Sequence, residues 1–151
     1  MKKIILYFYL CFIIGCSGYQ PLLSTNNLKF YVNDVENIGN NKITKNLIKK
    51  IKHLRLKNEK KREFNLKINS KKKLVIASKD AKGDPLIYKM IITTNLDVYE
   101  NDEKIGKIYL KEDFSFKNNS DNFNLSQYKM NIEENLINKT SEELVLKLQT
   151  M

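Results

Sequence analysis

Two long segments of strand-forming composition, joined by a short polar turn, constrain the fold of this 151-residue chain most strongly. Residues 86–99 and 104–116 are rich in Ile, Thr, Tyr and Val, which favour β-strands. The polar residues 100–103 lie between them and supply a turn. This arrangement predicts an antiparallel hairpin, which an earlier strand would extend into a meander.

The segment before this hairpin has a strand pattern that a basic run interrupts. Apolar and polar residues alternate over 64–68, and this period of two predicts a half-buried strand that resumes over 74–77. Between the two parts lies a tribasic run, which we expect to form a turn: Lys71, Lys72 and Lys73. Residues 79–84 contain Asp and Gly before Pro85 and predict another turn.

Two stretches have the three- and four-residue apolar spacing of amphipathic helices. The first begins near Asn40, with Asn41 as its N-cap, and its apolar residues are Ile43, Leu47, Ile48, Ile51 and Leu54. The second follows an Asn-rich loop over 115–124, and its apolar residues are Leu125, Tyr128, Ile132, Leu136, Leu144 and Leu148. A first strand over 28–32, which residues 33–34 would close, precedes both helices.

The order of these segments is β-α-β-β-β-α, which predicts the α+β class. We expect a four-stranded, largely antiparallel sheet with two helices packed on one face. No Gly-rich turn joins a strand to a helix in the sequence, which disfavours a dinucleotide-binding or P-loop fold.

Residues 1–15 have the layout of a secretory signal: two lysines, an apolar run over 4–14, and the small Gly15. As a helix, the apolar run would span about 16 Å at about 1.5 Å per residue, too short for a hydrocarbon core of about 30 Å. Residues 13–16, Ile-Ile-Gly-Cys, resemble the bacterial lipobox. The resemblance implies cleavage before Cys16 and acylation of its thiol and its new amino group.

Three segments are therefore expected: a lipoprotein signal peptide over 1–15, a lipidated tether over 16–27, and a single α+β domain over 28–151. Cys11 is not a competing lipidation site, because the bulky Leu10 precedes it where the signal peptidase requires a small side chain. An alternative is an uncleaved apolar anchor, in which Cys16 would be an ordinary residue at a membrane boundary.

The chain is strongly basic. After loss of Lys2 and Lys3 from 27 basic residues, 25 remain against 17 acidic ones, so the net charge would be 25 − 17 = +8. This charge favours anionic partners, but a lipobox places the chain across the inner membrane from the chromosome, so we do not expect nucleic acid. In a Gram-negative envelope the abundant polyanion is lipopolysaccharide. The basic residues cluster in two groups: Lys49, Lys50, Lys52, Arg55, Lys57, Lys60, Lys61 and Arg62, and then Lys71, Lys72, Lys73, Lys79 and Lys82.

Little in the sequence indicates catalysis, so we expect no enzyme, no metal and no cofactor. His53 is the only histidine, lies in the basic helix, and has no nucleophile motif beside it. Four acidic pairs lack diagnostic spacing, and we expect the pairs in the last helix to form ordinary surface contacts with its lysines: Asp80 and Asp84, Glu112 and Asp113, Glu133 and Glu134, and Glu142 and Glu143.

Residues 16–22, Cys-Ser-Gly-Tyr-Gln-Pro-Leu, resemble the start of the LPS-assembly lipoproteins of the LptE family, especially its alphaproteobacterial members. In those, Cys-Gly-Phe-x-Pro-Leu is common; this chain inserts Ser17 and has Tyr19 in the aromatic place. The resemblance implies a non-enzymatic plug and assembly partner of the outer-membrane β-barrel that inserts lipopolysaccharide. It also implies a lipid-anchored location on the periplasmic face of the outer membrane, to which Ser17 points by enterobacterial sorting rules. Lys71, Lys72 and Lys73 are candidate contacts for lipopolysaccharide phosphates.

Other functions stay open at this point. The chain could be an outer-membrane lipoprotein that serves as an adaptor of a different envelope complex. Weaker alternatives are a periplasmic hydrolase that uses the acidic pairs, and a soluble nucleic-acid binder whose N-terminus only resembles a signal.

Overall fold

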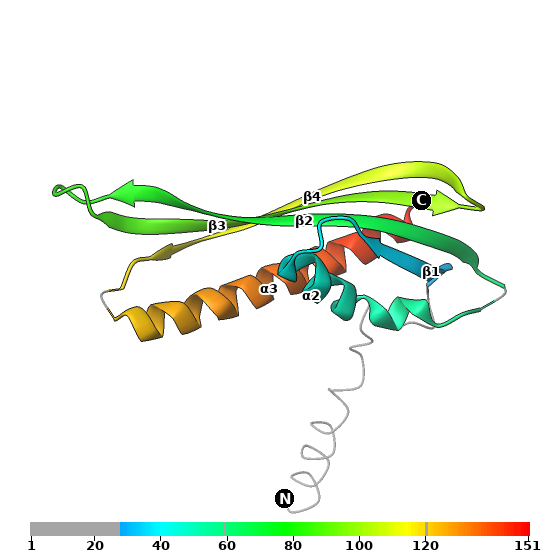
Figure 1. The fold of residues 1–151 in the computed structure, drawn as a ribbon, viewed down its shortest axis with the longest axis horizontal. Helices are drawn as coiled ribbons and strands as arrows, with labels where there is room; N and C mark the ends of the chain where they lie inside the picture. Colours follow the sequence, from blue (N-terminus) through cyan, green and yellow to red (C-terminus); the bar gives the residue numbers. More distant parts are fainter. Residues whose placement is uncertain (1–27, 59, 120) are drawn as a thin grey trace, which may run out of the picture.

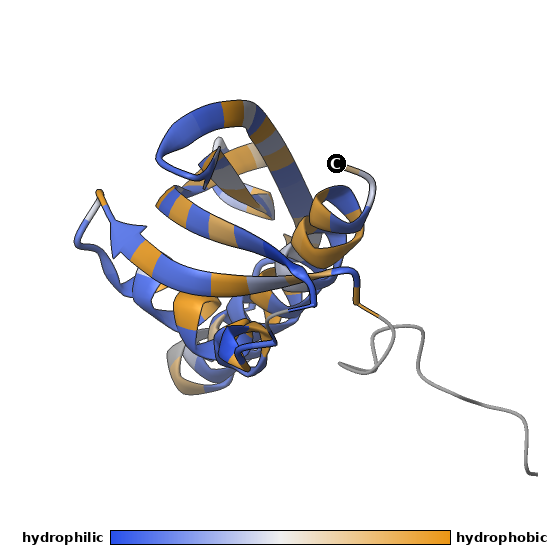
Figure 2. Cartoon of the chain, turned by 90° about the vertical axis from the view of Figure 1, so that its right-hand side faces the viewer, coloured by the Kyte–Doolittle hydropathy of each residue, from blue (hydrophilic) through white to orange (hydrophobic). Residues whose placement is uncertain are grey.

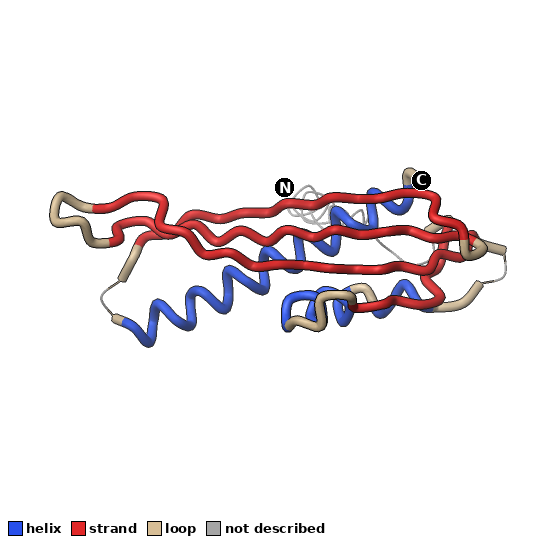
Figure 3. Tube along the Cα trace, turned by 45° about the horizontal axis from the view of Figure 1, so that its top comes forward, coloured by secondary structure: helices blue, strands red, loops and turns tan. Residues whose placement is uncertain are grey.

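The computed structural model describes residues 28–58, 60–119 and 121–151, which form an open four-stranded sheet with helices on one face (Figures 1 and 3). The strands are β1 (Phe30–Asn37), β2 (Arg62–Lys79), β3 (Pro85–Glu100) and β4 (Glu103–Lys117), in the spatial order β1-β2-β3-β4. The helices are α2 (Lys42–Lys50), a short 3₁₀ turn η3 (Lys52–Arg55), and α3 (Asn122–Gln149). The predicted α+β class, element order and one-sided helix packing are confirmed.

The predicted meander is the largest part of the sheet, because β2, β3 and β4 pair antiparallel along most of their length. Asn101 and Asp102 join β3 to β4 with φ of 49° and 65°. Two consecutive residues with positive φ are typical of a type I′ turn, whose twist matches that of the flanking strands. At the opposite end of the sheet, Gly83 adopts φ of 90° in the turn between β2 and β3, as the Asp and Gly content of this segment predicts.

The turn that we expected at Lys71, Lys72 and Lys73 is wrong. β2 runs unbroken from Arg62 to Lys79, and the three lysines pair with Thr93, Ile92 and Ile91 of β3. The β3 ladder supplies the backbone hydrogen bonds, and all three side chains are exposed, so their charges remain in water. A partner strand distant in sequence therefore overrides the local break in alternation.

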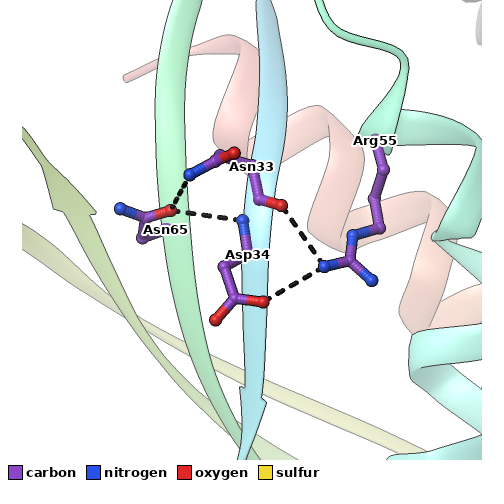
Figure 4. Close-up of polar contacts among 4 residues, drawn as sticks. All are labelled: Asn33, Asp34, Arg55 and Asn65. Carbon is purple, nitrogen blue, oxygen red and sulfur yellow. Dashed lines mark hydrogen bonds and ion pairs between the residues drawn. The ribbon is translucent and has the colours of Figure 1, made fainter.

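β1 is longer than predicted and pairs parallel with β2, whereas the other described strand pairs are antiparallel. Residues 33–34 do not close it; the register shifts between Val32 and Asp34, and the strand continues to Asn37. Figure 4 shows how side chains secure this irregularity. Asn65 Oδ1 accepts from Asn33 Nδ2 (3.3 Å) and from the Asp34 amide (3.2 Å), while Arg55 donates to the Asn33 carbonyl (3.3 Å) and to Asp34 Oδ1 (3.1 Å).

The core lies between the sheet and the helices. Hydrophobic and hydrophilic residues alternate along the strands, as the bands of Figure 2 show. Because successive side chains of a strand point to opposite faces, the buried apolar set lies toward the helices. The buried apolar residues of the strands include Phe30, Val32, Phe64, Leu66, Ile68, Met90, Ile92, Leu96, Val98, Ile108, Leu110 and Phe116. Those of the helical segments include Ile43, Leu47, Ile51, Leu54, Leu125, Ile132, Leu136, Leu144 and Leu148. Both predicted helical stripes are confirmed except at Ile48, which is partly buried, and Tyr128, which is 46% exposed.

A buried polar junction joins the start of α2 to β2. Asn41 caps the helix as predicted, because its Oδ1 accepts from the Thr44 amide at 2.9 Å. Asn41 Nδ2 also donates to the Ser70 carbonyl (2.7 Å), and the Ser70 amide donates to Thr44 Oγ1 (2.9 Å). Ser70 Oγ lies 2.8 Å from Thr94 Oγ1 on β3. These four residues place α2 where β2 runs past the end of β1.

Candidate functional site

The expected lipidation site, Cys16, and the rest of the tether lie outside the described residues. The chain enters the described domain at Leu28. The Lys29 carbonyl accepts from the Arg62 amide (3.2 Å), and the Lys29 amide donates to Gln149 Oε1 (3.3 Å). The entry point therefore lies beside the start of β2 and the end of α3, and the turn between β2 and β3 projects from the other end of the sheet (Figure 1).

The face of the sheet opposite α2 and α3 carries many charged side chains. Strand pairing places a set of lysines on it, and we call it the open face: Lys67, Lys71, Lys73, Lys89, Lys104, Lys107 and Lys111. Three carboxylates on the same face pair with three of these lysines. The pairs are Lys67 with Glu36 (2.9 Å), Lys89 with Asp113 (2.9 Å) and Lys104 with Asp97 (2.8 Å).

These pairs raise the pKa values of two lysines. A hydrogen bond to Glu36 and its negative charge raise the pKa of Lys67, and the hydrogen bond to Asp97 is the main cause of the raised pKa of Lys104. Both ammonium groups are solvent-exposed and stay protonated at neutral pH. Paired in this way, they contribute little net charge to the open face.

Four lysines of the open face have no carboxylate within ion-pair distance among residues 28–58, 60–119 and 121–151: Lys71, Lys73, Lys107 and Lys111. Lys71 and Lys111 lie opposite Thr93 on its two sides, and Lys73 is two residues further along β2. This cluster of Lys71, Lys73 and Lys111 is the strongest candidate on the open face for contact with phosphate or carboxylate groups.

The alternation of side chains along β2 separates the three predicted site residues. Lys71 and Lys73 lie on the open face, whereas Lys72 lies on the helix side and forms an ion pair with Glu133 of α3. Lys111 is not recognisable as a site residue from the sequence, because it belongs to the cluster through sheet register alone. The local sequence indicates only that Lys111 alternates with apolar residues along β4.

The residues considered for catalysis have structural partners. His53 is exposed and its Nδ1 lies 2.9 Å from the Lys50 carbonyl. Asp80 Oδ1 accepts from the Lys82 and Asp84 amides and closes the turn after β2. Among the described residues, no group of three or more His, Cys, Asp or Glu side chains is placed to hold a metal ion.

Three carboxylates of the acidic pairs, Glu112, Glu133 and Glu134, bind lysines of other elements. Glu112 of β4 pairs with Lys139 of α3 at 2.6 Å, and the hydrogen bond raises the pKa of Lys139. Glu134 pairs with Lys50 of α2 at 3.0 Å, and Glu133 pairs with Lys72. The expected pairing within the last helix is therefore wrong for Glu133 and Glu134, because α3 packs against α2, which brings Glu134 to Lys50, and Glu133 reaches Lys72 of β2.

A second feature is a set of apolar and aromatic side chains at the distal end of the helix side, away from the chain entry. Phe116 packs on Tyr88 (centroids 5.9 Å apart) and edge-to-face on Tyr128 of α3 (5.8 Å). Lys129 Nζ lies 5.0 Å from the Tyr88 ring centroid. Several large apolar side chains near this end are 41–78% exposed: Leu74, Ile76, Leu86, Phe114, Phe123 and Tyr128.

None of the helices in the described part of the chain is long and apolar enough to cross a membrane.

Comparisons with known proteins identify the fold. No family model matches the sequence, and no curated protein does. Solved structures do match. Rare lipoprotein B from Shewanella oneidensis superposes with a TM-score of 0.61 at 8% identity, covering 78% of this chain and 95% of that one. An uncharacterized lipoprotein B from Nitrosomonas europaea gives 0.62 at 11% identity, covering 88% and 91%, and a minor lipoprotein from Acinetobacter baumannii gives 0.60 at 11% identity, covering 82% and 92%.

The chain therefore has the fold of bacterial lipoproteins of the rare lipoprotein B type. At sequence identities of 8–11%, this likeness establishes the fold alone. It agrees with the lipobox at Cys16, which was found without any reference to the fold.

Proposed function

We propose that this protein is an outer-membrane lipoprotein that acts as a plug and assembly partner of the β-barrel that inserts lipopolysaccharide. The carrying observation is the match of its fold to rare lipoprotein B, a member of the LptE family, over 95% of that chain. The start of the sequence at residues 16–22, which resembles that family, supports the proposal independently. On this proposal the protein is not an enzyme and needs no cofactor.

Lipidation of Cys16 would hold the domain at the periplasmic face of the outer membrane. Three acyl chains provide stable anchoring, whereas a single chain binds a membrane only marginally. Residues 17–27 would then connect the anchor to Leu28, where the described domain begins beside the start of β2.

The open face suits a position inside a barrel. Many outer-membrane barrels have a polar interior, so a domain inside one needs hydrophilic outer surfaces. The uncovered side of the sheet presents lysines, carboxylates and amides rather than apolar side chains over much of its length. Lys71, Lys73 and Lys111, three of its four lysines without a carboxylate partner in the described structure, could also contact lipopolysaccharide phosphates during transport.

The phosphate contact can be tested with a matched control from the same strand. Replacing Lys71, Lys73 and Lys111 with Ala should weaken lipopolysaccharide binding, whereas Lys72→Ala should not, because that side chain lies on the helix side and pairs with Glu133. Equal binding by the triple variant and the wild type would remove the contact from the proposal.

The barrel partnership can be tested by affinity purification of the tagged full-length protein from its own envelope. The expected result is co-purification of one large β-barrel protein at a fixed stoichiometry. Cys16→Ser should abolish lipid attachment, seen by mass spectrometry of the N-terminal peptide, and Cys11→Ser is the matched control that should not. Recovery of a different envelope complex would favour the adaptor function instead, and an unmodified N-terminus at Met1 would contradict the lipoprotein assignment.

A further inference from the structure

The outer edge of β2 is only half covered. β1 pairs with β2 from Arg62 to Ile68, and the Ile38 amide adds a last bond to the Ile68 carbonyl (3.0 Å). Beyond that point β2 continues to Lys79, and no other strand within 28–58, 60–119 or 121–151 pairs with this side of it. We call residues Lys71 to Ser78 the distal edge.

The orientation of Ser70 shows which backbone groups face this edge. Its amide donates to Thr44 Oγ1 and its carbonyl accepts from Asn41 Nδ2, so both point away from β3. Backbone direction alternates along a strand. The amides and carbonyls of Lys72, Leu74 and Ile76 therefore point outward too, past the end of the polar junction with α2.

The side chains on the distal edge differ between the two faces of the sheet. On the helix side, Leu74 and Ile76 are 41% and 46% exposed. They continue the apolar alternation of β2, whose earlier members on this side are buried. On the open face, Lys71 and Lys73 are exposed. An occupant that matches both faces has apolar side chains on one side and acidic side chains on the other.

Charge also discriminates between occupants. Lysines on an edge strand deter pairing with a like edge, because two copies would bring lysines close together. The same lysines attract an acidic strand, since opposite charges on neighbouring strands stabilise pairing and like charges oppose it. The charges of Lys71 and Lys73 thus disfavour a second copy of this chain and favour an acidic partner.

We propose that the distal edge binds an extended segment of another protein as an added β-strand, with acidic side chains over Lys71 and Lys73 and apolar side chains over Leu74 and Ile76. Backbone hydrogen bonds to residues 72, 74 and 76 hold the segment, and the two faces select its sequence. This inference rests on the geometry of β2 and not on the proposed partnership with a barrel.

The probe for this site is a nine-residue peptide of alternating Glu and Val, labelled with fluorescein, and its binding to the full-length protein in detergent is measured by fluorescence anisotropy. Two N-methylated versions test the backbone bonds, one methylated at the Val residues and the other at the Glu residues. An antiparallel strand would turn the Val amides toward β2, and a parallel strand would turn the Glu amides toward it. We expect the parent peptide to bind saturably and one methylated version to bind at least tenfold more weakly. Equal binding by the two versions would overturn the proposal.

Variants of the protein test the same edge from the other side. Leu74→Pro removes an outward amide without removing a bond to β3, and proline is tolerated at such edge positions. It should weaken binding of the parent peptide at least tenfold. Ser115→Pro is the matched control on the outer edge of β4, where alternation also points the amide outward, and it should change binding less than twofold. Circular dichroism checks that both variants are folded, and the methylated peptides test the wild type directly.

A charge swap tests the selection of the partner. Lys71→Glu/Lys73→Glu should lose affinity for the Glu-Val peptide and gain affinity for a Lys-Val peptide of the same length. Unchanged preference would overturn the assignment of an acidic partner. Two further results would each overturn the proposal by identifying another occupant of the distal edge. A dimer that the peptide dissociates in sedimentation would identify a second copy of this chain. Binding that appears only after deletion of residues 17–27 would identify the chain's own N-terminal segment.

Discussion

Asn41→Ala is the substitution whose effect the structure specifies most fully. Asn41 Oδ1 caps α2 through the Thr44 amide, and Asn41 Nδ2 satisfies the carbonyl of the fully buried Ser70. Loss of an N-cap side chain costs about 1 kcal/mol. A buried carbonyl left without its donor costs about 1–3 kcal/mol. We therefore expect Asn41→Ala to lower the free energy of unfolding by about 2–4 kcal/mol, a large part of the 5–15 kcal/mol typical of a domain.

Two companion variants separate these contributions. Asp121 caps α3 through the amides of Phe123 and Asn124 but is exposed and bonds to no strand in the described structure, so Asp121→Ala should cost only about 1 kcal/mol. Asn41→Ser keeps a capping oxygen but cannot reach the Ser70 carbonyl, so its loss should be intermediate. Equilibrium urea denaturation followed by far-UV circular dichroism measures all three. Equal losses for Asn41→Ala and Asp121→Ala would refute the idea that Asn41 joins α2 to β2.

Further predictions concern the core, a surface ion pair and a turn. Phe64→Ala should cost about 3–5 kcal/mol in the same denaturation assay, because Phe64 is fully buried and packs on Phe30 with centroids 5.4 Å apart. The bidentate hydrogen bond from Arg62 (2.8 and 2.7 Å) holds the pKa of Glu100 below its ordinary value of 4.5, so the pair stabilises the fold above that pH and the contribution is lost as acid protonates Glu100. The stability difference between the wild type and Glu100→Gln should thus be largest near pH 7 and shrink below about pH 4.5; a difference independent of pH would contradict this. Gly83→Ala should cost about 1–3 kcal/mol through backbone strain at φ of 90°, since no atom within 4 Å would contact the new Cβ, and Gly83→Asn should cost less.

Much of the fold follows from local patterns. The stripes of both helices, the Asn41 cap and the two turns of the meander depend on residues within a few positions of one another, and each was predicted where the structure has it. The class of the fold then follows from the order of the segments. The residues that resemble a lipobox at Cys16 are likewise a local signal, which predicts a lipoprotein without any long-range information.

Predictions that depended on distant residues were less successful. Lys71, Lys72 and Lys73 break the alternation of β2 locally, but fourteen residue pairs with β3 hold that strand straight through them. The addition of Lys111 to the cluster depends on a register shift between Val98 and Tyr99. Counting back from the turn at Asn101 without this shift would place Leu110, not Lys111, opposite Thr93.

Short-range periodicity predicted the α+β class and the type of most elements, which the structure confirms. Motif chemistry predicts Cys16 as the site of lipid attachment, and this residue lies outside the described part of the chain. Long-range contacts, in contrast, were needed to show that β1 pairs parallel to half of β2, that Lys72 faces α3 while Lys71 and Lys73 face outward, and that no described strand pairs with the distal edge. Strand register and edge exposure are set by hydrogen bonds and packing between segments far apart in the chain, and one residue of shift moves every side chain to the opposite face.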